Sequence, residues 1–165
     1  MSELPRRVVR AFADHGSFER TSDDMWTSVT TAFAGDVAVD SDGDGRLRFE
    51  TTVRVPTLSD VTVDHVAEVV EDGWAETFER RVTDVGGVIR GDHEFDPAVS
   101  RAGREIVVRY AFEEINERRA VDDAGALIDF VEGTYVQGVI PGYEYTEPVT
   151  DLLSAARSQG GGGPR

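Results

Sequence analysis

The sequence predicts one α+β domain, in which helices cover an antiparallel sheet of about five strands in the element order α-βββ-α-ββ-α, with a short C-terminal helix. Large apolar residues recur every three or four positions across residues 63–85, as on one face of an amphipathic helix. Residues 46–55 alternate between polar residues and a mostly apolar set, which is typical of a strand with one buried face. The length of 165 residues suits a single hydrophobic core in residues 1–158, followed by a Gly-rich tail, 159–165, that is expected to be disordered.

The N-terminal part of the chain is predicted to form one helix and three strands. Gly16 suits the end of a short amphipathic helix whose apolar stripe consists of Leu4, Val8, Val9 and Phe12. After a brief extended piece around Phe18, residues 26–33 are rich in β-branched side chains and predict the first strand. Residues 37–39 predict a second strand, and residues 46–55 predict the third.

The segment 63–85 is predicted to be the central helix of the domain. Thr62 is the expected N-cap and Gly86-Gly87 the expected stop. The apolar stripe consists of Val63, Val66, Val70, Trp74, Phe78, Val82 and Val85. Because the residues between them are mostly charged, we expect this helix to lie against the sheet with its other side in solvent.

Beyond the central helix, the pattern predicts two strands and two helices. Residues 88–95 and 106–113 have the alternation expected of two strands, with a turn near residues 100–103 between them. A long helix is predicted from about residue 117 to 137. A last short helix, which Pro148 can open, is predicted to face the core with Val149, Leu152, Leu153 and Ala156.

The charge balance is strongly acidic. The chain has 32 Asp and Glu against 17 basic residues, a formal net charge of −15, and every basic residue is Arg. Such a charge repels nucleic acids and anionic membranes, so neither is expected as a general partner. A lysine-free acidic composition is typical of a protein in concentrated salt, where the Debye length falls to about 3 Å or less and self-repulsion is screened. An ordinary acidic protein from a GC-rich genome is the alternative.

The chain contains no Cys, which excludes disulfides, thiolate catalysis and Cys-ligated metals. No stretch approaches the ~20 apolar residues of a membrane helix, and the N-terminus lacks the hydrophobic region of a signal peptide. We therefore expect a soluble cytoplasmic protein.

Three segments of the chain resemble those of a known family: VRVPTL at 53–58, VEDGWAETFERR at 70–81 and VEGTYVQGVIPGYEY at 131–145. They resemble an uncharacterised family of small haloarchaeal proteins, a domain of unknown function. The element order also resembles the fold of type III secretion chaperones. The resemblance implies the α/β arrangement and a haloarchaeal source, but that family carries no established activity, so it implies no catalytic residue.

A run of acidic residues is the sharpest motif for a metal. Asp40, Asp42 and Asp44 have the D-x-D-x-D-G spacing of a calcium loop, but its twelfth position is Thr51 where a bidentate Glu is needed. We therefore interpret the run as a hairpin loop that binds cations weakly at most. The His residues are too scattered to predict a metal site, and no cofactor is expected.

The least ordinary stretch is residues 133–145, where three Tyr and one Gln lie among Gly and Pro. Such a segment could line a pocket or a partner groove, and the candidate site residues are Glu132, Tyr135, Gln137, Tyr143 and Tyr145. The alternative is a turn between two helices whose Tyr rings cap the edge of the core.

No motif in the sequence identifies catalytic residues. The leading hypothesis is a non-catalytic binding or chaperone-like module that acts on another protein through its sheet or its Tyr-bearing edge. A small-molecule-binding protein or enzyme, with a pocket between the sheet and the C-terminal helix, is the alternative. The chain is expected to be a monomer or a homodimer.

Overall fold

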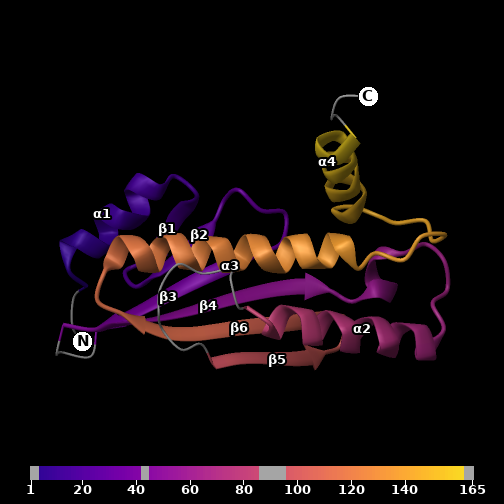
Figure 1. Cartoon of the computed structure of the whole chain (residues 1–165), viewed down its shortest axis with the longest axis horizontal. Coiled ribbons are helices and arrows are strands. Elements are labelled where there is room, and N and C mark those ends of the chain that lie inside the picture. Colours follow the sequence, from indigo (N-terminus) through magenta and orange to yellow (C-terminus); the bar gives the residue numbers. More distant parts are fainter. Residues whose placement is uncertain (1–3, 42–44, 86–95, 162–165) are drawn as a thin grey trace.

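Six antiparallel strands form one sheet, in the order β1-β2-β3-β4-β6-β5 (Figure 1). The computed structural model describes residues 4–41, 45–85 and 96–161. The strands are β1 (Phe18–Ser22), β2 (Met25–Ser28), β3 (Gly35–Ser41), β4 (Leu47–Pro56), β5 (Asp96–Ala102) and β6 (Glu105–Glu114). The helices are α1 (Arg6–His15), α2 (Glu68–Thr83), α3 (Glu117–Gln137) and α4 (Val149–Gly161), with a short 3-10 helix, η1 (Leu58–Val61). The predicted α+β class with an antiparallel sheet is confirmed.

The sheet has one strand more than predicted, because the extended piece around Phe18 is the edge strand β1. The predicted strand 26–33 is also wrong in extent, since β2 ends at Ser28 and Val29 is 55% exposed. In a longer strand, the backbone N–H groups of residues 32 and 33 would pair with a neighbouring strand, but here they donate to a side chain. The Glu132 carboxylate accepts the N–H groups of Ala32 (2.8 Å) and Phe33 (3.2 Å). These contacts turn the chain away from the sheet before β3.

The centre of the sheet follows the predicted alternation. In β4 the residues Leu47, Phe49, Thr51, Val53 and Val55 are buried, while the residues between them face away from the core. The adjacent strand β6 pairs with β4 over its whole length, from Leu47 opposite Glu114 to Pro56 opposite Glu105. Burying one face of two long adjacent strands fixes their register, because a shift by one residue would expose the whole apolar set.

The central helix is shorter than predicted at its N-terminal end. It begins at Glu68 after Ala67, so the prediction of a helix from residue 63 with an N-cap at Thr62 is wrong. Residues 62–67 do not form a helix because this segment pairs with a distant one. The Val63 N–H donates to the Glu144 carbonyl (2.8 Å). Val63 is consequently 63% exposed.

The remainder of the predicted stripe faces the core. Trp74, Phe78 and Val82 are buried on α2 as predicted. Val70 is half-buried and packs against them, and Val66 is buried although it precedes the helix. Val85 packs at the C-terminal end, and the predicted stop at residues 86–87 lies outside the described residues. The helical spacing was therefore informative from Glu68 onward.

The second hairpin lies later in the chain than predicted. The predicted strand 88–95 lies outside the described residues, and β5 occupies residues 96–102, where a connection and a turn were predicted. The turn is at Gly103, whose φ of +62° is a left-handed conformation that favours glycine. The strand that follows, β6, contains the predicted strand 106–113.

The N-terminal and long helices agree with prediction. α1 ends at His15, before Gly16, and α3 spans residues 117–137 with Asn116 as its N-cap, where the Asn116 side chain accepts the Arg119 N–H (3.0 Å). α3 lies close to β3, since a Cβ added at Gly35 would be 2.8 Å from Cγ2 of Ile128. A side chain at position 35 would therefore push α3 away from the sheet.

The C-terminal helix α4 contacts the chain mainly through its first turns. Val149 is fully buried, and Leu152 and Leu153 are half-buried, but Ala156 is exposed, contrary to the prediction. α4 packs near the end of α3 and leads away from the sheet, so its later turns have no apolar surface to cover (Figure 1). It extends to Gly161, and residues 162–165 lie outside the described residues.

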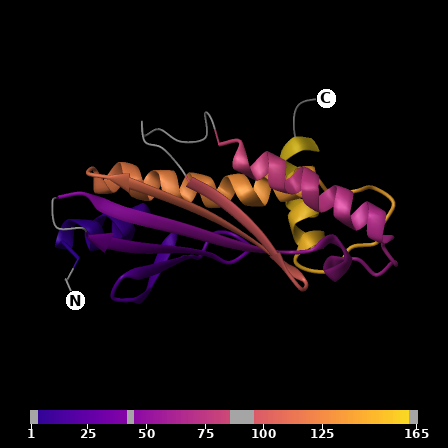
Figure 2. The same cartoon turned by 90° about the horizontal axis from the view of Figure 1, so that it is seen from below.

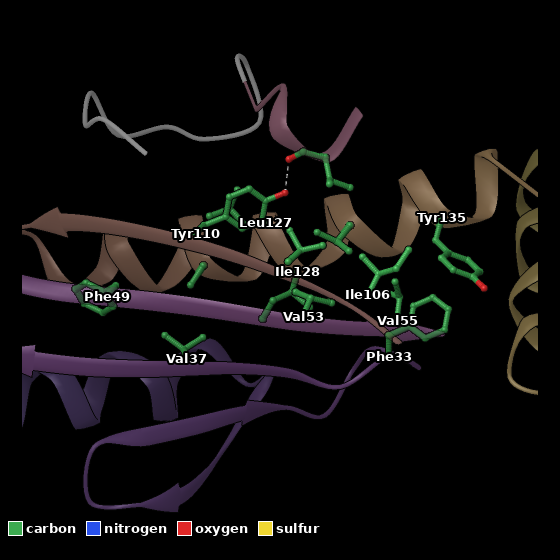
Figure 3. Packing of buried hydrophobic residues seen from close by; sticks show 14 of the residues in the cluster. Phe33, Val37, Phe49, Val53, Val55, Ile106, Tyr110, Leu127, Ile128 and Tyr135 are labelled. Carbon is green, nitrogen blue, oxygen red and sulfur yellow. Dashed lines mark hydrogen bonds between the residues drawn. The ribbon is translucent and has the colours of Figure 1, made fainter. Parts of the chain in front are cut away.

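One hydrophobic core joins the helices to the sheet (Figure 3). Leu127 and Ile128 of α3 lie over Val53, Ile106 and other apolar side chains of β4 and β6. α1 packs on the same side, because Phe12 stacks on Trp26 of β2 with ring centroids 4.1 Å apart. α2 is joined to this side by the hydroxyl of Tyr110, which donates to the Val82 carbonyl. Figure 2 shows α2 and α3 along one side of the sheet.

Candidate functional site

Residues 133–145, here called the Gly/Tyr segment, are held in the fold by hydrogen bonds of the segment and of Thr146 beside it. The Tyr145 hydroxyl donates to the Ile140 carbonyl (2.6 Å) and accepts the Ile140 N–H (2.9 Å), closing a loop. The Glu144 N–H donates to a carboxylate oxygen of Asp64 (2.7 Å), and the Thr146 N–H donates to the Val61 carbonyl (2.8 Å). These contacts give the segment a structural role between α3 and α4.

The five predicted site residues do not converge on one pocket. Glu132 holds the connection before β3, and Tyr145 closes its own loop. Tyr135 is only 1% exposed, with its ring edge-on to those of Trp74 and Phe78 and to that of Phe33. Gln137 is exposed, and Tyr143 is half-buried against the core. The structure therefore spreads these residues over several environments.

Two buried tyrosines differ in what their hydroxyls contact. The Tyr110 hydroxyl bonds to the Val82 carbonyl, whereas the Tyr135 hydroxyl has no hydrogen-bond partner among the described residues (Figure 3). Burial raises the pKa of both phenols, and for Tyr135 the nearby Tyr145, Glu71 and Asp60 raise it further. Glu71 is itself buried and accepts the Ser59 N–H (3.1 Å) and hydroxyl (3.0 Å).

This contrast predicts opposite effects of removing the two hydroxyls. Tyr110→Phe should lower the free energy of unfolding by about 1–3 kcal/mol, because the buried Val82 carbonyl loses its donor. Tyr135→Phe should leave it unchanged or raise it, because a buried hydroxyl without a described partner is removed. Denaturant unfolding at pH 7 measures both values, and equal losses would contradict the contrast.

The same phenols predict instability in alkali. The folded state holds the two pKa values above the unfolded value of about 10, so their contribution to stability is complete below pH 10. It is lost as the pH rises further, because only the unfolded chain then releases these protons. Absorbance of phenolate should therefore show Tyr110 and Tyr135 ionising only as the protein unfolds.

The acidic loop offers little for a metal in the described residues. Asp40 lies at the end of β3, opposite Arg48 of β4, while Asp42 and Asp44 lie outside the described residues. Elsewhere in the described chain, no group of three or more His, Asp or Glu is placed to hold a metal ion. His15 lies 3.4 Å from the Asp122 carboxylate, and its role there is to join α1 to α3.

The face of the sheet opposite the helices has no covering element among the described helices. The helices contact the sheet through the core-facing residues, and the alternate residues of the central strands are mostly exposed. On β3, β4, β6 and β5 these residues form rows set by the strand register. The central three rows are Ala38, Glu50, Ala111 and Asp96; Asp36, Thr52, Arg109 and Ala98; and Arg54, Val107 and Ser100. We call these strands' outward residues the uncovered face.

Two arginines stand out on the uncovered face. Arg54 and Arg109 form no ion pair with any residue that the structure describes, although the chain carries a net charge of −15. Each is one strand away from the other on a diagonal, since Arg54 is opposite Val107 and Arg109 is opposite Thr52. Val107 is opposite Arg54 and two positions before Arg109 on β6, and it is only 9% exposed.

A groove of about 410 Å³ lies where β4 ends. Arg54, Pro56 and Glu105 line it together with Asp60 of η1 and Arg104 of the β5–β6 turn. Arg104 lies 3.6 Å from the Asp60 carboxylate, and its side chain is largely exposed. The groove therefore combines an apolar floor with two basic and two acidic side chains.

The sequence analysis did not identify Arg54 and Arg109, because each is simply a polar residue in an alternating strand. The signal that could have identified them is the pairing register of the two strands. Once β4 and β6 are paired, the alternation places both residues on one face.

These features define a protein with a single six-stranded antiparallel sheet that helices cover on one side. The chain belongs to a family of unknown function (DUF5813), whose model matches residues 13–155. No curated protein and no solved structure matches the chain significantly. Across the described residues, the helices are too short or too polar to span a bilayer.

Proposed function

We propose that this protein is a non-catalytic binding module that acts on another protein molecule through the uncovered face of its sheet. One observation carries the proposal. The helices that the structure describes pack on a single side, so the outward residues of four adjacent strands, β3, β4, β6 and β5, lie on an exposed surface. An antiparallel sheet can leave such a face in water, and the side chains on it then decide whether it binds.

The size and chemistry of the face suit a protein partner. The ten-residue strands β4 and β6 each span about 33 Å and the seven-residue strands β3 and β5 about 23 Å, which gives roughly 500 Å² in projection at about 4.8 Å per strand. That is of the same order as the ~800 Å² per partner of a standard interface. Arg is enriched at such interfaces, and Arg54 and Arg109 are free of ion pairs to described residues.

The setting we propose is the cytoplasm of a haloarchaeon. The net charge of −15 and the absence of Lys support it, as does the resemblance of three segments to small haloarchaeal proteins. The element order, in which helices flank two groups of antiparallel strands, supports a chaperone-like role by analogy of fold.

A small-molecule site is the second candidate, and the groove at the end of β4 favours it. The groove lies beside η1 and the β5–β6 turn, away from α4, so it differs from a pocket between the sheet and the C-terminal helix. Arg54 and Arg104 opposite Asp60 and Glu105 would suit a zwitterionic ligand.

Site-specific cross-linking tests the protein-binding proposal. Because the chain has no Cys, Thr52→Cys places one thiol in the middle of the uncovered face, and Glu79→Cys places one on the exposed side of α2 as a matched control. Each variant is labelled with a maleimide photo-cross-linker and irradiated in a high-salt lysate of the native host. We expect adducts from Thr52→Cys that excess unlabelled wild-type protein suppresses, and none from Glu79→Cys. Equal labelling from both positions, or none from Thr52→Cys, would refute the proposal.

A further inference from the structure

We infer that the groove at the end of β4 binds a free α-amino acid with an aliphatic side chain, whose carboxylate contacts Arg54 and whose ammonium contacts Glu105. This inference rests on the second candidate function, the small-molecule site, and it names the class of ligand. The reason is that two side chains of opposite charge border one apolar floor without pairing with each other.

The two charged residues come from neighbouring strands. Pro56 of β4 is opposite Glu105 of β6, so Arg54, two positions before Pro56, is a diagonal neighbour of Glu105 on the uncovered face. Diagonal neighbours in an antiparallel pair are about 7–8 Å apart, within the reach of two long side chains. Nevertheless, Arg54 and Glu105 form no ion pair with each other or with any other residue that the structure describes. Both charged groups are therefore available to a ligand.

The second pair of charges in the groove already has its partners. Arg104 lies 3.6 Å from the Asp60 carboxylate. The Thr57 N–H also donates to the Arg104 carbonyl (2.9 Å), which joins the β5–β6 turn to the residue before η1. These contacts hold one wall of the groove in place, so Arg54 and Glu105 remain as the pair that a ligand can engage.

The floor between the charged side chains is apolar. Ala34, Pro56 and Ala102 line the groove together with Val55, and none of these side chains carries a polar group. The volume of about 410 Å³ is within the range of small-ligand pockets, about 300–1,000 Å³. An aliphatic side chain of the ligand would cover this floor and leave water, which is favourable.

The net charge of the protein favours a ligand that carries both charges. At −15, the chain repels anions in general, and its excess of carboxylates attracts cations to many places on its surface. A zwitterion has no net charge, so neither effect acts on the whole molecule. Its recognition then depends on the local arrangement of Arg54 and Glu105.

The spacing of the two side chains points to an α-amino acid. A guanidinium donates two parallel N–H groups to a carboxylate, and a carboxylate accepts from an ammonium, each at about 2.7–2.9 Å. A ligand whose charged groups share one carbon separates Arg54 from Glu105 by little more than two such contacts. A long ω-amino acid holds its charges too far apart for two diagonal neighbours.

Both side chains that contact the ligand are exposed. Water and salt therefore weaken each contact, and we expect dissociation constants on the order of millimolar. Protein-observed NMR of the 15N-labelled full chain in molar KCl at pH 7 measures affinities in this range. The signals to follow are the Arg54 side-chain Nε–H and the backbone amides of Arg54, Ala102 and Glu105.

Four probes test the chemistry of the ligand. Leucine should shift the signals of the groove in a saturable way. N-acetylleucine lacks the ammonium, and leucinamide lacks the carboxylate, so each should bind about tenfold more weakly or worse, because one charge-assisted contact is lost. 6-Aminohexanoate carries both charges at a longer spacing and should also bind more weakly than leucine.

Two variants assign each charge of the ligand to one residue. Arg54→Gln should weaken the binding of leucine and N-acetylleucine and leave leucinamide unchanged, whereas Glu105→Gln should weaken leucine and leucinamide and leave N-acetylleucine unchanged. Arg80→Gln and Glu79→Gln remove the same charges at exposed positions of α2 and should change no dissociation constant. A purely structural effect of either groove variant would weaken all the probes alike, so the crossed pattern separates the two roles.

Each outcome decides the inference. It is overturned if N-acetylleucine, leucinamide or 6-aminohexanoate binds as tightly as leucine, or if Arg54→Gln and Glu105→Gln affect all the probes alike. In those cases the groove still binds a small molecule, and the second candidate function stands without this ligand. If no probe shifts the signals of the groove at concentrations well above millimolar, both fail. The protein-binding proposal is tested separately at Thr52, which does not line the groove.

Discussion

Replacing Trp74 by alanine is expected to lower the free energy of unfolding by about 3–5 kcal/mol. Trp74 is only 6% exposed, stacks on Phe78 with ring centroids 5.7 Å apart, and is edge-on to Tyr135 at 5.4 Å. Removing the indole leaves a cavity between α2 and α3, lined by rings that cannot collapse into it. The loss therefore includes both the transfer free energy and the cavity.

Glu76→Ala on the same helix is the matched control for Trp74→Ala. Glu76 is exposed, and alanine is a strong helix former, so the control should change stability by less than about 0.5 kcal/mol. Denaturant unfolding in high salt, followed by circular dichroism, measures both variants. A loss below about 1 kcal/mol for Trp74→Ala would show that the packing between α2 and α3 contributes little.

Elements whose stability comes from their own pattern could be predicted from the sequence. β4 and β6 alternate because one face is buried along their whole length, and α3 combines helical spacing with Asn116 as a cap. For such elements the local preference and the tertiary packing agree, and local patterns are then sufficient.

Elements decided by distant contacts could not be predicted. Residues 62–67 have the spacing of a helix, but the Val63 N–H is taken by the Glu144 carbonyl, about eighty positions later in the chain. Likewise, residues 29–33 have the β-branched content of a strand, but Glu132 of α3 accepts the N–H groups of Ala32 and Phe33. In both places a partner far along the sequence changes the local outcome.

The candidate site shows the same limit. The Gly/Tyr segment has an unusual composition, but the paths of α3 and of the loop after it separate its aromatic and amide side chains. The uncovered face has an ordinary composition, and its arrangement emerges only when β4, β6 and β5 are aligned. Strand register is a tertiary property, so the positions that share a row with Thr52 could not be identified from spacing alone.

The stability of this protein is expected to rise steeply with salt between dilute buffer and molar KCl. A net charge of −15 on a chain of 165 residues destabilises the compact state by self-repulsion, which counterions screen. Salt also weakens the attractive pairs, such as Arg118 with Asp14 (2.6 Å) and Arg101 with Asp72 (3.0 Å). These pairs are exposed to solvent and therefore contribute little, so relief of the repulsion should be the larger effect.

Two regimes should be visible in the melting temperature. Screening should saturate once the Debye length, about 3 Å at 1 M, is shorter than the spacing of the charges, and any further gain must come from stronger apolar burial. A gain of ~3 kcal/mol would raise Tm by roughly 6–12 °C for a chain of this size. Thermal unfolding across KCl concentrations measures both regimes, with sucrose as a control that favours compactness without screening. If Tm were flat from dilute to molar KCl while sucrose raised it, repulsion between the carboxylates would have no part in the stability of this fold, and the high-salt setting would lose its physical basis.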